Sequence, residues 1–257
     1  MAEVTFNFVS NATGGDKFTV VSFTGSEAIS TLYQYELEIK APLSAAINLD
    51  DLLEYPCRFV TEQGGQEYPV YGVLSSINES KTLQGYGYYH AILVPRLWKL
   101  STYKTNEIFS TAAVTVPTII KEVLDNGGLD SSTDYDLNGL DTTRFLTRDY
   151  VCQFGESDFD FISRLMENEG IFYYFEQDST DAKEKIIFVN DLNYDDISPS
   201  KIVSFGDAGV DDRIYSWSCR KQRLPLDVRV RDYNPDEPSV DISDHTSIDT
   251  MGQGTEY

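Results

Sequence analysis

Six consecutive residues near the middle of the chain resemble the first half of a calcium-binding loop. Asp134, Asp136 and Asn138 are separated by single residues and are followed by Gly139, which matches the oxygen ligands and the turn glycine of an EF-hand. The twelfth position of such a loop needs a glutamate, but Phe145 stands there. We therefore predict a plain acidic loop, with the three oxygen-bearing side chains as a weak metal candidate and with no cofactor.

Residue types that catalyse hydrolysis are scarce. The chain has two histidines, His90 and His245, and the strand-like surroundings of His90 are typical of a half-buried structural histidine. Residues 155–159 resemble the turn that presents a nucleophilic serine, but the second glycine of that turn is missing. Ser157 is expected to cap a helix instead, and the acidic residues beside it suit the positive end of the helix dipole. We predict no catalytic residue and no enzymatic activity.

The chain is strongly acidic, with 42 Asp and Glu against 20 Lys and Arg and a net charge of -22. Because affinity for a phosphate backbone comes from cationic side chains, this balance disfavours nucleic acid and anionic membranes as partners. No Lys or Arg follows Arg231, whereas seven acidic residues do. This end of the chain is either a solvated tail or an electrostatic complement to a basic partner.

The three cysteines, Cys57, Cys152 and Cys219, are widely spaced and form no Cys-x-x-Cys motif. This pattern fits neither a disulfide framework nor a zinc site, and it favours the reduced thiols of a cytoplasm. Residues 1–10 lack the basic and apolar segments of a signal peptide, and no run approaches the roughly 18 apolar residues of a membrane span. We expect cytoplasmic assembly without stable membrane anchoring, and any export by a route that needs no signal peptide.

The hydropathy pattern predicts a mainly β fold with a few short helices, an α+β protein. The clearest strand covers 33–40, where apolar and polar residues alternate. Similar runs separated by glycines occupy the N-terminal part of the chain, as in a barrel or sandwich. Helices are expected near 117–126, with Pro117 in the first turn, and over 157–169, which Gly170 ends.

The segment from Arg148 to Phe175 resembles a signature of the VgrG family, the valine-glycine-repeat spike proteins of type VI secretion, and by extension the tail hub proteins of contractile phages. It contains an aromatic pair around a glutamine, a Glu-Ser-Asp helix start, Arg-Leu, and then Glu-Gly-Ile with aromatic residues. Weaker matches follow the family's order at 18–30, 95–100 and 230–238. Together the resemblance covers nearly the whole chain.

The recurring residues of these motifs are caps, apolar faces, turn glycines and aromatic strands, which is typical of a scaffold rather than of a catalytic site. We expect structural roles for Arg148, Gln153, Glu156, Ser157, Asp158, Phe161, Arg164, Leu165, Glu169, Gly170, Trp98, Asn234 and Pro238.

The resemblance implies a phage tail hub fold with two related β-barrel-like units. We expect the first unit over 1–97, the second over 98–212, closing strands over 213–238 and an acidic linker over 239–257. Full-length relatives continue into a further barrel and a β-helical needle. We therefore expect this chain to be either a truncated piece or a naturally short hub.

The function implied is that of a structural spike hub in a contractile injection apparatus that helps to deliver effectors. The expected assembly is a homotrimer whose six barrel-like units match a hexameric tail tube. The tube protein, baseplate proteins, a tip protein and effectors are the expected partners. Two alternatives stay open: a carrier for an enzymatic effector fused beyond Tyr257, and a carbohydrate- or calcium-binding β module.

Overall fold

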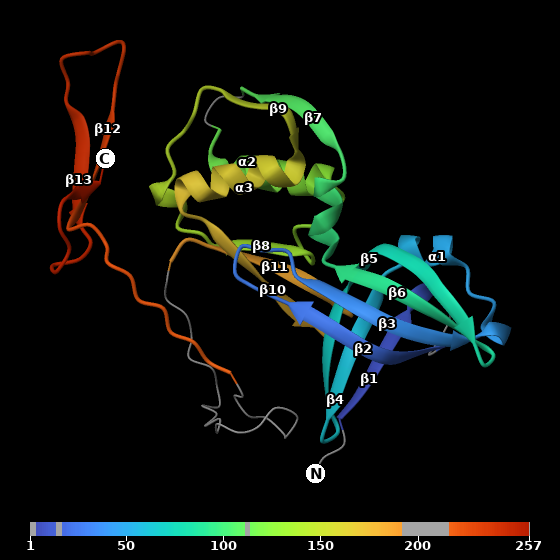
Figure 1. The fold of residues 1–257 in the computed structure, drawn as a ribbon. Helices are drawn as coiled ribbons and strands as arrows, with labels where there is room; N and C mark the ends of the chain where they lie inside the picture. Colours follow the sequence, from blue (N-terminus) through green and yellow to red (C-terminus); the bar gives the residue numbers. More distant parts are fainter. Residues whose placement is uncertain (1–3, 14–16, 111–113, 192–215, 257) are drawn as a thin grey trace. The chain divides into compact units, whose positions relative to one another are not determined.

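The computed structural model describes residues 4–13, 17–110, 114–191 and 216–256 (Figure 1). The chain divides into two compact units, Met1–Asn193 and Tyr194–Tyr257. In the described residues, no helix is long and apolar enough to cross a membrane. The part of the predicted second hub unit that covers 192–212 lies outside the described residues.

The N-terminal part of the first unit is a closed barrel of six strands in the order β1-β2-β3-β6-β5-β4. The strands are β1 (Val4–Ser10), β2 (Phe18–Ser26), β3 (Gln34–Pro42), β4 (Cys57–Gln63), β5 (Gln66–Leu83) and β6 (Tyr86–Val94). All neighbours are antiparallel. The short helix α1 (Leu49–Glu54) lies between β3 and β4 in the chain.

The barrel forms because apolar residues alternate along its strands, so that one face of each strand turns inward. Phe8, Leu37, Ile39 and Leu93 are fully buried inside it. The connection between β4 and β5 contains a glycine pair with positive φ, 61° and 82°, which glycine adopts without steric cost. The last strand ends at Val94, close to the predicted end of the first unit at 97.

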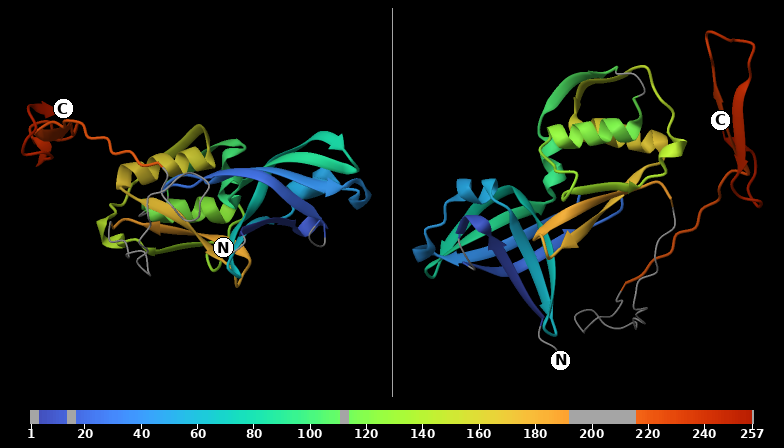
Figure 2. Two further views of the ribbon diagram at one scale, coloured as in Figure 1. Left: turned by 60° about the horizontal axis from the view of Figure 1, so that its bottom comes forward. Right: turned by 180° about the vertical axis from the view of Figure 1, so that it is seen from behind.

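The rest of the first unit consists of two small sheets and two helices. The three-stranded sheet has the order β10-β11-β8, and the two-stranded ribbon pairs β7 with β9. Helices α2 and α3 lie between the sheet and the ribbon (Figures 1 and 2). The bounds are β7 (Lys104–Phe109), α2 (Val116–Asn126), β8 (Tyr135–Gly139), β9 (Val151–Ser157), α3 (Asp158–Glu169), β10 (Phe172–Asp178) and β11 (Lys183–Val189).

In the described part of 98–191 the strands form two separate sheets around the two helices. The second barrel-like unit over 98–212 stays a prediction, since 192–212 lies outside the described residues. The predicted loop at 134–139 is mostly strand β8, because Tyr135 is buried in the helical core and β8 pairs in parallel with β11. The mainly β fold itself, with few helices and a closed barrel, confirms the predicted fold class.

The second unit contains a three-stranded sheet with the order β13-β12-β14. Strand β12 (Asp227–Asp232) pairs antiparallel with β13 (Ile242–Ser247) and parallel with β14 (Thr255–Glu256). The segment expected to be an acidic linker, 239–257, therefore contains two of these strands. All residues of β13 are exposed, so backbone pairing rather than a hydrophobic face holds it.

Candidate functional site

The predicted helix cap at Ser157 begins α3. The Ser157 hydroxyl accepts a hydrogen bond from the Asp160 backbone N–H at 3.1 Å and donates to Asp160 Oδ2 at 2.7 Å. At the other end, Gly170 adopts a φ of 69° and its N–H donates to the Met166 carbonyl oxygen. Both ends of the helix are therefore specified by local residue types.

Asp158, in the first turn of α3, is a buried acceptor that joins three elements. Its Oδ1 accepts hydrogen bonds from Gln153 Nε2 at 2.8 Å and from Thr105 Oγ1 at 3.0 Å, and its Oδ2 accepts one from the Tyr103 hydroxyl at 2.7 Å. Burial, followed by the hydrogen bond to Asp158, raises the pKa of Tyr103 to about 12, which keeps this hydroxyl protonated as a donor. The Asp158 carboxylate thus holds β7 and β9 against α3 through these hydrogen bonds.

Two arginines attach the outer surface of α3 to its surroundings. Arg164 binds both carboxylate oxygens of Glu156 through Nε, at 3.0 and 2.9 Å, and its Nη2 donates to the Cys152 carbonyl oxygen at 2.7 Å. Arg148 forms an ion pair with Glu169 near the end of the helix. These contacts tie the segment before α3 to the middle and to the C-terminal end of the helix.

The remaining signature residues lie in three parts of the chain. Phe161 and Leu165 are buried in the core of the helical region. Trp98 is half-buried in the 3-10 turn Arg96–Ser101, which follows the barrel. Asn234 and Pro238 lie between β12 and β13, where Asn234 Oδ1 accepts from the Asp236 N–H at 3.0 Å.

The weak metal candidate has cationic neighbours. Asp134 Oδ1 lies 2.8 Å from Lys183 Nζ and 3.2 Å from Arg96 Nη1, and Asp136 Oδ2 lies 3.4 Å from Lys185 Nζ. Burial raises the pKa of Asp134, but the hydrogen bond from Lys183, further hydrogen bonds and the charge of Arg96 outweigh it and bring the pKa to about 2. Across the described ranges, no group of three or more His, Cys, Asp or Glu is arranged to hold a metal.

Arg96, immediately after the barrel, is bound to Glu184 on β11. Glu184 Oε1 accepts hydrogen bonds from the Arg96 backbone N–H at 2.7 Å and from its Nε at 3.0 Å, and Arg96 Nη2 donates to the Glu184 carbonyl oxygen at 2.9 Å. Only 2% of Glu184 is exposed. This junction joins the barrel to the helical region, and no local pattern in the sequence indicates it.

Aromatic contacts reinforce the same junction. The Tyr33 hydroxyl donates to the Tyr71 carbonyl oxygen within the barrel, and the Tyr33 ring packs on Phe175 of β10 at a centroid distance of 4.9 Å. Gln177 of β10 accepts from the Tyr71 N–H at 2.9 Å. The barrel and the helical region therefore form one body.

The β7–β9 ribbon carries an exposed apolar face. Its inner residues, including Phe109 and Val151, are buried in the helical core. On the opposite face, Ile108 is 61% exposed and Phe154 is 81% exposed. Tyr150, directly before β9, is 58% exposed. We call Ile108, Tyr150 and Phe154 the ribbon face. Large exposed apolar side chains grouped on one surface are typical of a contact site for another protein.

A family model described as "Phage tail baseplate hub (GPD)" matches residues 26–257. The spike protein VgrG5 of Pseudomonas aeruginosa is 36% identical over 159 residues, which cover 62% of this chain and 19% of that protein. VgrG1c of the same organism is 25% identical over 256 residues, which cover 97% of this chain and 34% of that protein. Both are named type VI secretion system spike proteins, and this chain matches about a third of their length or less.

A solved structure gives the same result for the fold. The Escherichia coli c3393 protein is described as a component of the type VI secretion system with structural similarity to the bacteriophage T4 tail proteins gp27 and gp5. It superposes with a TM-score of 0.60 at 24% identity, covering 75% of this chain and 47% of that one. The family match and the spike relatives confirm the resemblance that the Arg148–Phe175 segment indicated. This chain belongs to the phage tail baseplate hub family.

Proposed function

We propose that this chain is the hub region of a spike in a type VI-like contractile injection apparatus, and that it acts in assembly rather than in catalysis. The observation that carries the proposal is the family match over 26–257, which includes four of the six barrel strands in full and all of the helical region. The signature residues support a scaffold, since their polar groups bind other parts of the same chain.

The proposed assembly is a homotrimer that caps a hexameric tail tube. Three copies of a chain with two tube-facing parts present six such parts, which matches the symmetry of a sixfold ring. Within the first unit, we propose the barrel and the helical region as these two parts, divided near 97. Further proposed partners are baseplate proteins, a tip protein and effectors, and the proposed route out of the cell is through the apparatus itself.

The ribbon face is the surface we assign to assembly. It is apolar and exposed, and the strands that carry it are held from behind by Asp158 and the helical core. A rigid apolar patch loses little conformational entropy when it docks, which favours a stable contact.

The test is cryo-electron microscopy of the full-length protein mixed with purified tube rings. We expect threefold particles seated on the ends of the tubes, with the barrel and the helical region of each chain at the tube rim. Light scattering on the protein alone should give the mass of three chains. A monomer that leaves the tube ends bare would overturn the proposal.

A further inference from the structure

The first unit has an aromatic groove at one mouth of the barrel. We define it by Phe23, Tyr35, Phe59 and Tyr68 with the carboxylates Glu27 and Glu67, and its volume is about 530 Å³. The strand register places its floor inside the barrel: Phe59 pairs with Val70 and is 2% exposed, and Thr61 pairs with Tyr68. Barrel mouths are places where β proteins commonly bind ligands.

Phe23, Tyr35 and Phe59 of the groove form a continuous cluster. The ring of Phe59 lies 4.7 Å from that of Phe23 and 5.7 Å from that of Tyr35, measured between centroids. Phe23 is 38% exposed and Tyr68 is 55% exposed, so the cluster is buried at its base and open at its rim. Ring faces are therefore available for stacking against a bound group.

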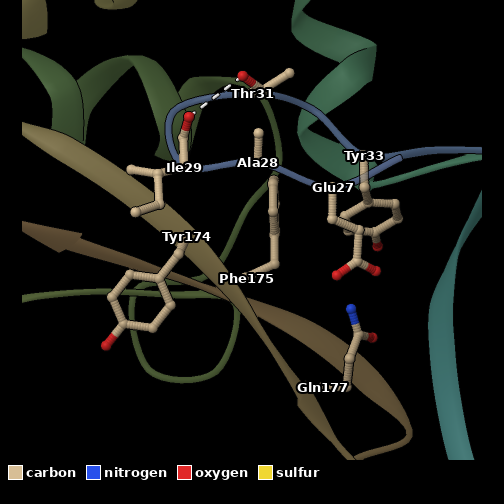
Figure 3. Close-up of a pocket in the computed structure, with 8 residues that line it drawn as sticks. All are labelled: Glu27, Ala28, Ile29, Thr31, Tyr33, Tyr174, Phe175 and Gln177. Atoms are coloured by element: carbon tan, nitrogen blue, oxygen red, sulfur yellow. Dashed lines mark hydrogen bonds between the residues drawn. The ribbon is translucent and has the colours of Figure 1, made fainter. Parts of the chain in front are cut away.

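A second hollow of about 260 Å³ continues from the groove, sharing Glu27 and Gln177 with it. It lies between the β2–β3 connection and β10, and Tyr33 and Phe175 line it. Figure 3 shows the Glu27 carboxylate and the Gln177 amide pointing toward one another. The two hollows together form an elongated depression that suits an extended chain.

The charge of this depression is one-sided. Glu27 and Glu67 line it, no Lys or Arg does, and neither carboxylate takes part in an ion pair within the described residues. Residues 1–95 contain 11 Asp and Glu but four Lys and Arg. The field at the barrel mouth therefore attracts cations, and aromatic faces bind Lys and Arg side chains through cation–π contacts.

We propose that the aromatic groove binds an extended peptide segment of a partner protein that carries Lys or Arg. The cationic side chains meet Glu27 and Glu67 and stack on Tyr68 and Phe23. The Gln177 amide oxygen is taken by the Tyr71 N–H, so that Nε2 is the Gln177 atom placed to donate to a peptide carbonyl. A neutral sugar would use the same rings but gains nothing from the carboxylates' charge. This proposal stands on the groove itself and does not depend on the hub being assembled.

The test uses a terminally blocked, fluorescently labelled peptide in which Arg and Lys alternate with Ser and Pro, and a control peptide with Glu at every cationic position. Fluorescence anisotropy with the complete chain should show binding of the cationic peptide and none of the acidic one. Binding should weaken as salt is raised, because screening reduces the attraction between charges.

Two variants separate the groove from the general acidity of the protein. Tyr68→Ser leaves every charge in place and should weaken binding about tenfold through loss of stacking. The double variant Glu27→Gln with Glu67→Gln should weaken it at least as much. The matched control, Glu36→Gln with Glu79→Gln, removes two barrel carboxylates that do not line the depression and should leave the Kd within about twofold.

Thermal unfolding of each variant verifies that the barrel remains folded. The proposal is overturned if Tyr68→Ser and the control bind as tightly as the parent chain, since attraction would then be non-specific. It is equally overturned if a neutral hexasaccharide binds in the groove and the cationic peptide does not. Unchanged binding of the sugar in the Glu27 and Glu67 variant would then assign the groove to carbohydrate.

Discussion

The carboxylate of Glu184 receives two hydrogen bonds from Arg96, one from the backbone N–H at 2.7 Å and one from the side-chain Nε at 3.0 Å. Arg96 follows the last barrel strand, and Glu184 lies on β11 of the sheet that packs under the helices. The pair therefore sets where the chain leaves the barrel. Glu184 is almost fully buried, and Arg96 supplies the opposite charge that compensates its carboxylate.

Removing the Glu184 acceptor should destabilise the first unit. Glu184→Ala leaves the Arg96 guanidinium without its main partner, and we expect a loss of about 3 kcal/mol in the free energy of unfolding. Glu184→Gln keeps one acceptor oxygen and should lose less. Urea unfolding followed by tryptophan fluorescence measures both changes. A loss below about 0.5 kcal/mol, the size expected for the exposed control Glu79→Gln, would show that the junction does not depend on this pair.

The cap of α3 gives a second prediction. Ser157→Ala removes the acceptor of the Asp160 N–H and should lower the free energy of unfolding by about 1 kcal/mol. Ser157→Thr keeps a hydroxyl that accepts from the Asp160 N–H and donates to the Asp160 carboxylate, and it should restore most of that stability. Circular dichroism during thermal unfolding measures the three proteins, and Ser22→Ala on an exposed strand position serves as the control. If Ser157→Ala and Ser22→Ala have the same free energy of unfolding, the Ser157 cap does not contribute to stability.

Elements with local signals were predictable from the sequence. Helix α3 is specified within a short stretch by Ser157, its apolar stripe and Gly170, and the structure places the helix at Asp158–Glu169. Barrel strands β3 and β6 show clean alternation because one face of each is buried and the other is more exposed. The spacing of apolar residues in the sequence indicates which face of an element is buried. These elements were predictable because each has one well-defined buried face.

Elements held by distant partners were not predictable in this way. Arg96 and Glu184 are 88 positions apart in the chain, and neither has a local pattern that names the other. Asp134 and Asp136 were interpreted as candidate oxygen ligands, yet they face Lys183 and Lys185 of the neighbouring strand. Strand β13 has exposed side chains throughout, so its sequence resembles a linker. These features depend on contacts between residues far apart in the sequence, so local sequence patterns do not reveal them.

The Asp134 pKa predicts a pH-dependent contribution to stability. Its folded pKa of about 2 lies below the ordinary value of 3.8, so the ionised form is favoured by folding. The contribution, about 2 kcal/mol, is fully present above pH 3.8 and is lost as pH falls toward 2. The difference in unfolding free energy between the parent chain and Asp134→Asn should therefore shrink over that range. A difference that stays constant from neutral pH to pH 2 would contradict this assignment.

The ribbon face yields a prediction that separates assembly from folding. Phe154 is 81% exposed, so Phe154→Ser should change the free energy of unfolding of the chain by less than about 0.5 kcal/mol. If the ribbon face is an assembly surface, the same change should weaken trimer formation or tube capping in the full-length protein at least tenfold, because a central aromatic side chain often carries much of the energy of a contact. Analytical ultracentrifugation measures trimer formation, and co-sedimentation with tube rings measures tube capping.

Leu83→Ser, at an exposed position beside the β5–β6 turn, is the matched control and should assemble normally. Equal behaviour of the two variants would assign assembly to another surface, whereas a selective defect in Phe154→Ser would place the contact on the strands that Asp158 holds against α3.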